Sequence, residues 1–524
     1  MLAYFVIGPI VVAVFLYLFP FERAAKLIAI AAQAVLLGSA FYLFNLSNES
    51  VVIDVIGHYY GPLGIALRAD ALSSVFVLLA AFIFLIVSIY SYSDKSSRMF
   101  WMLLFIWEGA LIGIFLAGDL FNIFVLTEVA TLSVTVLIMY YRDKRSMYDG
   151  LIYLMINFVV VQFYLLGLGY IYRVVGFMDM EVIANLVPYI ESGQLLLPYA
   201  FLMTFVALKC AMVPLYNWLP KAHSTPGATP AVSAVLSGLH IKSGVYLFMR
   251  LQYIFGTIEV GSFFLILGLI TAGFGVLMAL AQKDIKRILA YSTIAQIGLI
   301  IAGLNTGSFY NQMGSLIHSI NHALIKAALF LSAGMIAYHY DTRDVDKIRG
   351  VMKSMPFVGM AALFAIMGMI GMPAFNGSIS KYFLVYGVSW QLNAIFVIIN
   401  LGTIMIFIRF AAMLTGTGPE RAKSDFWKEG PLIFLGSMCL VFGIFGEHLI
   451  TFLFGWEARI SLAGYLEKAA IFAASVAVGM LALKYGLKDR AFLARLREVD
   501  LGFREMCAAI GMFFAVFLVA VGFF

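Results

Sequence analysis

The sequence predicts an all-α polytopic membrane protein, and its composition and the length of its apolar segments are the observations that predict it. Of 524 residues, 63% are hydrophobic and 12% are charged, and the mean hydropathy is +0.99. A soluble domain has about 25% charged residues, and a single water-soluble core stops growing near ~250–300 residues. The composition therefore excludes a soluble enzyme, a nucleic-acid-binding protein and a disulfide-stapled secreted domain. The apolar runs also lack the alternation of transmembrane β-barrel strands.

Sixteen apolar segments are long enough to cross a bilayer when they are read in a window of about 19 residues. The first is predicted to be retained, because no basic segment or small-residue cleavage site of a signal peptide accompanies it. The predicted spans are residues 2–20, 25–45, 70–93, 99–118, 120–141, 148–175, 197–218, 230–252, 261–281, 286–304, 310–339, 355–389, 391–416, 430–454, 468–486 and 506–524.

The basic residues support this count. Most of the 34 Lys and Arg residues lie in loops that follow odd-numbered spans. The positive-inside rule places those loops in the cytoplasm and both termini outside. Outside loop 46–69 is predicted to form a hairpin (strands 51–56 and 61–66), and loop 176–196 a surface amphipathic helix. The basic segment 484–504 is predicted to lie on anionic lipid or on a partner subunit.

The three cysteines, Cys210, Cys439 and Cys507, are far apart and form no CxxC pattern. They cannot supply the ligands of an iron–sulfur cluster or a zinc ion. We interpret them as small apolar residues, and we expect neither a metal site nor a cofactor in this chain.

Ionisable residues at membrane depth are the main functional candidates. An ionisable group at the bilayer centre costs about 2.5–3.5 kcal/mol on insertion scales, so it is a functional hypothesis by default. The alternative is that Glu–Lys pairs only hold helices together, and this alternative weighs most for Arg409 and Glu447, near helix ends. The residues are Lys209, Lys242, Lys326, Lys381, Arg409, Glu108, Glu128 and Glu447.

Buried lysines suit proton transport. Burial favours the neutral form of a lysine, and a nearby carboxylate favours the charged form again. A lysine whose carboxylate partner moves can therefore load and release a proton, whereas an arginine stays charged. His318, His322 and Lys326 are spaced four residues apart, on one helical face, which favours a proton path. Buried core histidines are the alternative, and one helical face cannot provide both axial ligands of a haem.

Two spans contain helix breakers beside a lysine. Span 7 has Pro214 and Pro220 after Lys209, and span 12 has Pro373 and Gly377 before Lys381. Proline removes a helical hydrogen bond, and the carbonyls that it frees at membrane depth need partners, which the neighbouring lysines could provide.

The pattern Pro-x-aromatic-Asn occurs at both breaks, which lie five spans apart. An odd offset inverts orientation, so spans 4–8 and 9–13 are predicted to be inverted repeats with the transport site at their breaks. The predicted domains are residues 1–98 (helices 1–3 with the hairpin), 99–252 (first repeat), 261–416 (second repeat) and 417–524 (helices 14–16).

Five motifs resemble a known family, the antiporter-like subunits of respiratory complex I, Mrp-type sodium/proton antiporters, membrane-bound hydrogenases and sulfane reductases. They occur in the family's order and cover roughly residues 70–415. The motifs are KCAMVPLYNWLPKAHSTPGATPAVSAVLSGLHIKSGVYLFMR at 209–250, GDLFNIFVLTEVATLS around residue 128, QKDIKRILAYSTIAQIGLIIAGL at 282–304, HSINHALIKAALFLSAG at 318–334 and GMPAFNGSISK at 371–381.

The resemblance implies about 14 core transmembrane helices with two inverted five-helix repeats and broken helices 7 and 12, here followed by about two extra C-terminal helices. It also implies a pair of Glu128 with Lys209. The loop before span 8 is about two residues longer than usual, which leaves either His240 or Lys242 as the residue of that helix. His322, Lys326 and Lys381 match the ionisable residues of helices 11 and 12.

These inferences predict a proton-translocating membrane subunit without a redox centre or cofactor of its own. Protons would enter near His240 and Lys242, pass along Lys209, His318, His322 and Lys326, and leave near Lys381. Motion of Glu128 relative to Lys209 would gate the transfer.

The expected partners are other membrane subunits of the same complex in the cell membrane, the lipid bilayer, and protons, with sodium passing, if at all, through a partner subunit. No nucleic acid is expected. Two alternatives are a scaffold subunit whose lysines are structural and a stand-alone secondary transporter.

Overall fold

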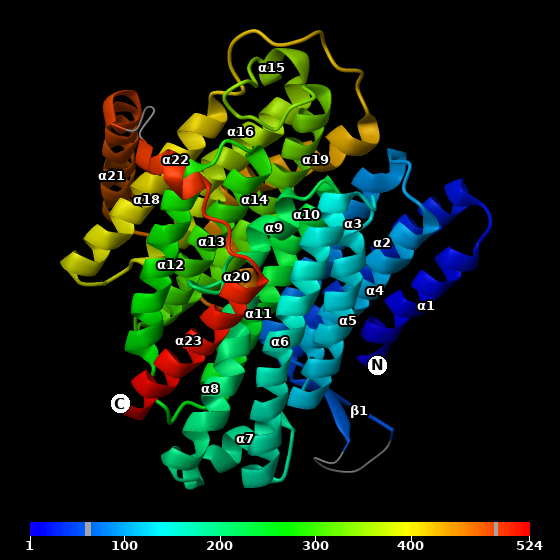
Figure 1. Cartoon of the computed structure of the whole chain (residues 1–524), viewed down its shortest axis with the longest axis vertical. Coiled ribbons are helices and arrows are strands. Elements are labelled where there is room, and N and C mark those ends of the chain that lie inside the picture. Colours follow the sequence, from blue (N-terminus) through cyan, green and yellow to red (C-terminus); the bar gives the residue numbers. More distant parts are fainter. Residues whose placement is uncertain (58–63, 487–490, 524) are drawn as a thin grey trace. The chain divides into compact units, whose positions relative to one another are not determined.

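The computed structural model describes residues 1–57, 64–486 and 491–523, and most of them are helical (Figure 1). In this described part, 14 helices are long and apolar enough to cross a membrane, and two shorter apolar helices are α1 (Ala3–Leu18) and α16 (Pro356–Ile370). Each of the sixteen predicted spans coincides with one of these helices or with the halves of a broken one. The all-α polytopic fold is therefore confirmed.

The helices form two compact units. The first comprises Met1–Ala228, Leu239–Val260 and Leu501–Phe524. Besides α1, its elements are α2 (Glu22–Glu49), β1 (Val52–Ile56), β2 (Ile65–Ala69), α3 (Ala71–Tyr90), η1 (Ser91–Ser93), α4 (Arg98–Leu116), α5 (Leu120–Ile138), α6 (Lys144–Val175), α7 (Met180–Leu186), η2 (Val187–Tyr189), α8 (Ser192–Lys209), α9 (Trp218–Ser224), α11 (Ile241–Ile254) and α23 (Phe503–Phe523).

The second unit comprises Thr229–Gly238 and Gly261–Asp500. The π-helix η3 (Leu236–His240) begins in this unit and leads into α11. Besides α16, the other elements are α10 (Pro230–Val235), α12 (Gly261–Ala281), α13 (Ile285–Leu304), α14 (Phe309–His339), α15 (Val351–Ser354), α17 (Asn376–Leu384), α18 (Trp390–Ala411), α19 (Phe426–Ile444), α20 (Gly446–Phe454), α21 (Leu462–Leu481), η4 (Ala482–Gly486) and α22 (Ala491–Arg497).

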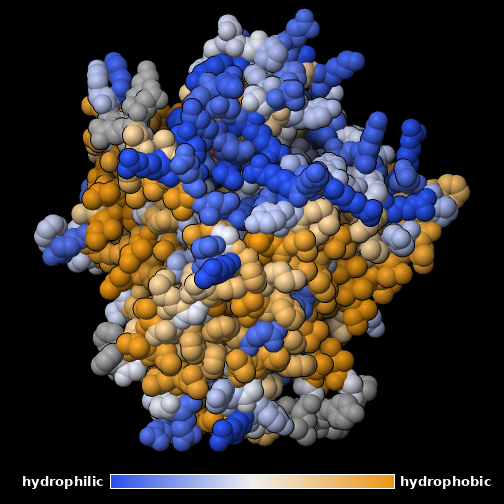
Figure 2. All heavy atoms as spheres, in the orientation of Figure 1, coloured by the Kyte–Doolittle hydropathy of each residue, from blue (hydrophilic) through white to orange (hydrophobic). Residues whose placement is uncertain are grey.

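The sides of the helices are apolar in the way that a bilayer requires. Figure 2 shows hydrophobic side chains along the exposed sides of the helices and hydrophilic side chains gathered near their ends. Helices α13 and α14 are buried along most of their length, whereas α21 is exposed along most of its length. Helix α14 of the second unit, which carries His318, His322 and Lys326, is therefore shielded from the surroundings of that unit.

Local capping explains where predicted boundaries differ from the structure. Helix α6 begins at Lys144, four residues before the predicted span, because the Asp143 side chain accepts hydrogen bonds from the backbone N–H groups of Arg145 and Ser146. Such caps satisfy the free donors of a first helical turn. The cap therefore allows α6 to begin before the apolar segment from which the span was predicted.

The predicted hairpin is confirmed, with a shift in its second strand. Strand β1 pairs antiparallel with β2, and Val52 opposes Ala69 while Ile56 opposes Ile65. The second strand thus ends three residues later than predicted, because it continues directly to Asp70, the residue that caps α3. Residues 61–63 of the predicted strand lie outside the described residues, as do 487–490 of the basic segment and 524 of the last span.

The two units repeat one backbone arrangement. In the first, Leu120 N–H donates to Met178 O and Met180 N–H donates to Gly118 O, which closes the chain around α5 and α6. In the second, Ile285 N–H donates to Arg343 O and Val345 N–H donates to Lys283 O, which closes the chain around α13 and α14. A constant offset of 165 residues (120 to 285 and 180 to 345) relates the two sets. The correspondence supports the predicted repeats, whose boundaries remain a prediction.

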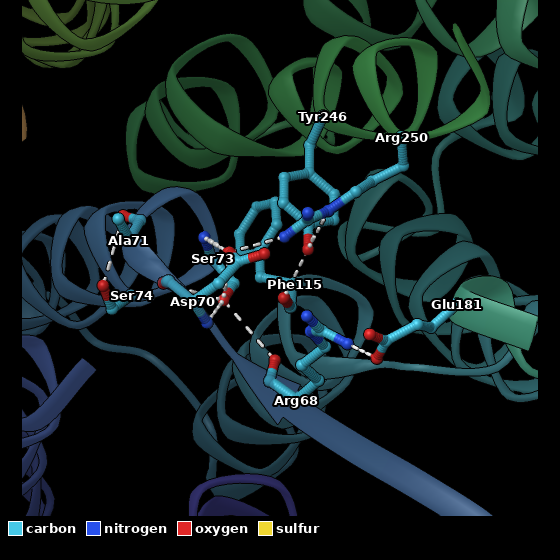
Figure 3. Close-up of polar contacts among 9 residues, drawn as sticks. All are labelled: Arg68, Asp70, Ala71, Ser73, Ser74, Phe115, Glu181, Tyr246 and Arg250. Carbon is cyan, nitrogen blue, oxygen red and sulfur yellow. Dashed lines mark hydrogen bonds and ion pairs between the residues drawn. The ribbon is translucent and has the colours of Figure 1, made fainter. Parts of the chain in front are cut away.

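An ion pair ties three helix ends of the first unit together (Figure 3). Arg250, near the end of α11, donates to Asp70 Oδ1 at 2.7 Å and to the Tyr246 hydroxyl at 3.0 Å. Tyr246 donates in turn to Phe115 O, one of the free carbonyls at the end of α4. Asp70 also caps α3 through Ser73. One cluster therefore joins the ends of α3, α4 and α11, while Arg68 and Glu181 form a separate ion pair beside it.

The charge of Asp70 makes this cluster sensitive to acid. Burial alone would raise the pKa of Asp70, but the hydrogen bond and charge of Arg250 and the hydrogen bonds from Ser73 together outweigh burial, so the pKa lies below its ordinary value. A carboxylate with a lowered folded-state pKa stabilises the fold above its unfolded pKa, and this stabilisation is lost as the pH falls through the folded pKa. The contribution is therefore fully present at neutral pH.

We expect Asp70→Asn to lower the free energy of unfolding by about 1–3 kcal/mol at neutral pH, because Arg250 then loses a charged partner. The loss should shrink under strongly acidic conditions, where the wild-type carboxylate is itself protonated. Thermal unfolding of the purified protein at several pH values measures both effects. Glu457→Gln, in the exposed pair with Arg459, is the matched control. An equal destabilisation at all pH values would contradict this explanation.

Candidate functional site

The first broken helix ends at Lys209. Ala211 has a left-handed backbone with φ of 50°, and the chain then passes through Pro214 before α9 begins at Trp218. Pro220 is not in the break but in the first turn of α9, where proline is tolerated. The Trp218 indole donates to Leu208 O at 2.8 Å, a carbonyl that also accepts from Ala211 N–H in the break. Lys209 was expected to bind a carbonyl freed by the break, but its hydrogen bonds go elsewhere.

The Lys209 ammonium is instead held by two neutral oxygens. It donates to Asn157 Oδ1 at 2.6 Å and to Thr131 Oγ1 at 3.1 Å. Asn157 is oriented by its own amide, which donates to Tyr153 O at 2.8 Å. Lys209 is buried, so these partners replace water around its charge.

Glu128 lies on α5, one helical turn before Thr131, and it is half-buried. Its charge and that of Lys209 attract each other. Its Oε1 atom has no hydrogen-bond partner among the described residues. Glu128, the predicted partner of Lys209, therefore lies near it, but the hydrogen bonds of Lys209 go to neutral groups.

His240 ends a chain of hydrogen bonds that begins at Lys209. Its Nδ1 accepts from the Trp107 indole at 3.3 Å, and its Nε2 is 3.2 Å from the Tyr153 hydroxyl, which is hydrogen-bonded to Thr131. An indole N–H only donates, so Nδ1 must be unprotonated and Nε2 must carry the hydrogen. This arrangement fits the neutral imidazole, because an imidazolium would face the indole N–H with a second donor.

Lys242 lies two residues further along, in the first turn of α11, and is fully buried. A side chain at Gly244, in the same turn, would meet the backbone of Lys209 and Cys210 at about 3.0 Å, so α11 packs directly against the end of α8. The structure thus places both candidates of this helix in the first unit with Lys209, and it connects His240 to Lys209 through hydrogen bonds.

His318, on α14, has partners of a different kind. Its Nε2 is 2.9 Å from Gln296 Oε1 and its Nδ1 is 2.9 Å from Ser380 Oγ. The Gln296 amide is oriented by donating to Thr403, whose hydroxyl donates to a carbonyl of α18. Gln296 Oε1 therefore accepts from His318, whereas a serine hydroxyl can donate or accept. His318 can consequently keep both hydrogen bonds in its neutral and its charged form.

The other two ionisable candidates of α14, His322 and Lys326, lie on the same helical face as His318. The rings of His318 and His322 have centroids 6.2 Å apart, which matches the predicted spacing. The Lys326 ammonium donates to Leu289 O at 2.8 Å and to the Ser292 hydroxyl. His322 and Lys326 are both fully buried. The predicted line of ionisable residues on one helical face is therefore present in the second unit.

The second broken helix has Lys381 at its break. Helix α16 ends before Gly371, whose φ of 79° is a left-handed conformation that glycine adopts without strain, and Pro373 lies in the connecting loop. Lys381 donates to Met369 O at 2.7 Å and to Asn400 Oδ1 at 2.8 Å. Here the lysine does satisfy a carbonyl freed by the break, as expected.

Gly377 has a role other than the predicted break. It is the second residue of α17, and a side chain there would overlap the carbonyl oxygen of Gly368. The residue therefore permits close packing of α17 on the end of α16, and Gly371 with Ala374 (φ of 68°) makes the reversal itself.

The two secondary acidic candidates, Glu108 and Glu447, differ in their surroundings. Glu108, on α4, is fully buried and accepts from the Gln33 amide of α2. Glu447, at the start of α20, accepts from the backbone N–H of Ile460 at 2.7 Å, so it holds the loop before α21.

Arg409 behaves as the structural alternative describes. Its guanidinium pairs with Asp346 at 2.9 Å and donates to the carbonyls of Leu280 and Gln282 at the end of α12. These contacts fix the end of a helix, which is the structural role that the alternative describes.

The neutral polar residues that hold the charged ones were not predicted from the sequence. A signal existed in the repeat: the 165-residue offset aligns Thr131 with Gln296, Tyr153 with His318 and Asn157 with His322. Each first-unit member of these pairs belongs to the hydrogen-bond network of Lys209, and Gln296 and His318 contact each other in the second unit. Aligning the helix caps Asp119 and Asp284 would have found them.

The part of the chain that carries both broken helices matches a known family. Residues 117–409 match the family described as "NADH:quinone oxidoreductase/Mrp antiporter, TM", a range of more than half the chain. The chain is 32% identical over 474 residues to the N-type subunit of the NADH-quinone oxidoreductase of Desulforudis audaxviator, covering 82% of this chain and 92% of that protein.

Two further comparisons extend the likeness. The D-type subunit of the Na(+)/H(+) antiporter of Alkalihalophilus pseudofirmus is 28% identical over 464 residues, covering 85% of this chain and 94% of that protein. A chain of the Mrp complex from Dietzia sp. superposes with a TM-score of 0.80 at 21% identity, covering 91% of this chain and 99% of that one. The solved structure shows that the two chains share a fold.

Proposed function

The chain belongs to the NADH:quinone oxidoreductase/Mrp antiporter membrane family, and we propose on this premise that it moves protons along its buried lysines and histidines. It would do so as the antiporter-like subunit of a multisubunit ion-pumping complex in the cell membrane. The observation that carries the proposal is Lys209, a buried ammonium at a broken helix held by two neutral oxygens near the carboxylate of Glu128.

Glu128 is the proposed gate of Lys209. In a low-dielectric interior, the attraction between two charges depends strongly on their separation. When Glu128 approaches the ammonium, the charged lysine is stabilised, and when it withdraws, only Thr131 and Asn157 remain to stabilise the charge. The lysine then gives up its proton more readily, so small movements of α5 would load and unload it.

We propose different roles for His240 and His318. His240 accepts from Trp107 and orients Tyr153 and Thr131 toward Lys209, so it positions the network as a neutral group. His318 faces Gln296 Oε1 and a serine hydroxyl that can reverse its hydrogen bond, so it can carry a proton. Lys242 in the first unit and His322, Lys326 and Lys381 in the second are the other proposed carriers.

The direction of transport and the orientation in the membrane belong to the same proposal. The positive-inside pattern supports odd-numbered loops in the cytoplasm and both termini outside. Protons would enter through the first unit and leave at Lys381. The chain offers few acids at membrane depth, and sodium sites usually need convergent carboxylates and carbonyls, so any sodium would pass through a partner subunit.

The relatives point to two kinds of complex. One is named as part of a quinone oxidoreductase and the other as part of a Na(+)/H(+) antiporter. The driving reaction would belong to partner subunits in the first case. Hydrogenase-like or quinone-reductase-like genes beside this one would mark a redox-driven complex, and their absence would mark an Mrp-type antiporter.

We expect Lys209→Ala in the reconstituted complex to reduce coupled ion movement by about two orders of magnitude or more, because a proton carrier is removed. Assembly should be intact. Ion movement in proteoliposomes and the subunit composition of the purified complex measure the two outcomes. Lys423→Ala, at an exposed position, is the control. Unchanged ion movement would overturn the proposal, and loss of assembly would favour the scaffold role.

Ser380→Ala should slow ion movement about tenfold, because the imidazolium of His318 loses the hydroxyl that accepts from it, at a cost of roughly 1.4 kcal/mol. Ser380→Thr keeps the hydroxyl and should retain most of the rate. Initial rates in proteoliposomes distinguish the two variants. If both variants slow transport equally, the hydroxyl has no part in proton transfer and packing explains the loss.

A further inference from the structure

The Lys381 side chain lies on a cavity that the extra C-terminal helix α21 helps to enclose. The cavity has a volume of about 100 Å³ and is lined mainly by residues of α17, α18 and α21, together with Leu299 of α13 and residues of the break. Its polar lining includes Asn393, Asn400 and Ser475 besides Lys381, and Asn393 Oδ1 has no hydrogen-bond partner among the described residues. This volume has room for several water molecules beside those polar groups.

Helix α21 also makes a specific contact with the second break. The hydroxyl of Tyr465 accepts a hydrogen bond from Ala374 N–H at 2.6 Å. Ala374 is, like Gly371, a residue of the break with a left-handed backbone, and its N–H lies between the two helices and is not used by either. Helix α21, which is mostly exposed, is therefore anchored at the break between α16 and α17. It also packs along α18.

A second lysine faces the same cavity. Lys468, one helical turn after Tyr465, lines the cavity together with Lys381. The Lys381 ammonium has three N–H donors, and two of them are used by Met369 O and Asn400 Oδ1. A positive charge that lines the same cavity as an ammonium group disfavours the charged form of that group.

Few other ionisable groups line the cavity beside Lys381 and Lys468. The titratable residues of the cavity wall are Lys381, Tyr382, Tyr465 and Lys468. Helix α16 has no titratable residue, and Arg409 is engaged at the end of α12. Among the packed neighbours, α14 presents His318 to Ser380, and Cys439 of α19 donates to Leu435 O. Lys468 is therefore the charged residue from another helix that lines the cavity.

We propose that α21 encloses the vestibule into which Lys381 releases its proton, and that Lys468 is a positioning residue that promotes this release. The positive charge of Lys468 disfavours a second positive charge on Lys381, and the vestibule takes up the proton that leaves. Tyr465 keeps α21 in place by its bond to the break. This inference rests on the proposed proton path. It assigns a role to α21, which lies outside the two predicted repeats.

The test uses the assembled complex in proteoliposomes, with ion movement measured across a range of pH. In Lys468→Met, Lys381 should hold its proton more tightly, and the pH of half-maximal activity should rise by roughly half to one unit. Lys468→Glu should move it further in the same direction. Lys468→Arg keeps the charge and should match the wild type. Arg459→Gln, at an exposed position near the start of α21, is the control.

The outcomes separate this inference from the proposed function. Lys381→Ala should abolish ion movement, and if it does not, the proton path itself is wrong. If Lys381→Ala abolishes movement but Lys468→Met and Lys468→Glu keep the wild-type pH profile, only the role of Lys468 is overturned. Equal loss of activity in Lys468→Met and Lys468→Arg would also overturn it, because it would indicate a packing role. Tyr465→Phe should lower activity without moving the pH profile, and a shifted profile would contradict the anchoring role.

Discussion

The rest of the structure depends on one constraint: an ammonium group away from water needs oxygen atoms that the protein itself supplies. Lys209, Lys326 and Lys381 each meet it with a different set of carbonyl, hydroxyl and amide oxygens. All of these hydrogen bonds go to neutral oxygens. The charges are therefore stabilised by dipoles that leave the lysines able to lose a proton, which a tight ion pair would oppose.

The two breaks use their lysines differently because side chains on a helix point toward its N-terminus. Lys209 is the last residue of α8, so its side chain points back along that helix, away from the break, toward α5 and α6. Lys381 is the sixth residue of α17, so its side chain points back toward the break and reaches Met369 O. Trp218, in the second half of the first broken helix, points back in the same way and binds Leu208 O.

Hydropathy, basic loops and proline positions predicted the spans, both breaks and the charged residues, because each of these signals is local. The neutral partners Thr131, Asn157 and Gln296 could not be found from local pattern, since a polar residue on a buried helix looks the same whether it faces a lysine or its own backbone. Gly377 and Pro220 were assigned to the breaks because breaker residues cluster there, but close helix packing and a first helical turn explain them. The extra C-terminal helices were predicted as spans, and their contacts with the breaks required the structure: Tyr465 meets Ala374, and Asn217 donates to Leu501 O before α23.

In the proposed mechanism, the approach and withdrawal of Glu128 control the proton on Lys209. The most direct measurement is the initial rate of ion movement by the reconstituted complex with Glu128→Gln, which keeps the shape of the side chain and removes its charge. We expect a fall of about tenfold or more with an intact complex, and a smaller fall in Glu128→Asp, which keeps the charge. A Glu128→Gln complex that moves ions at the wild-type rate would contradict the mechanism.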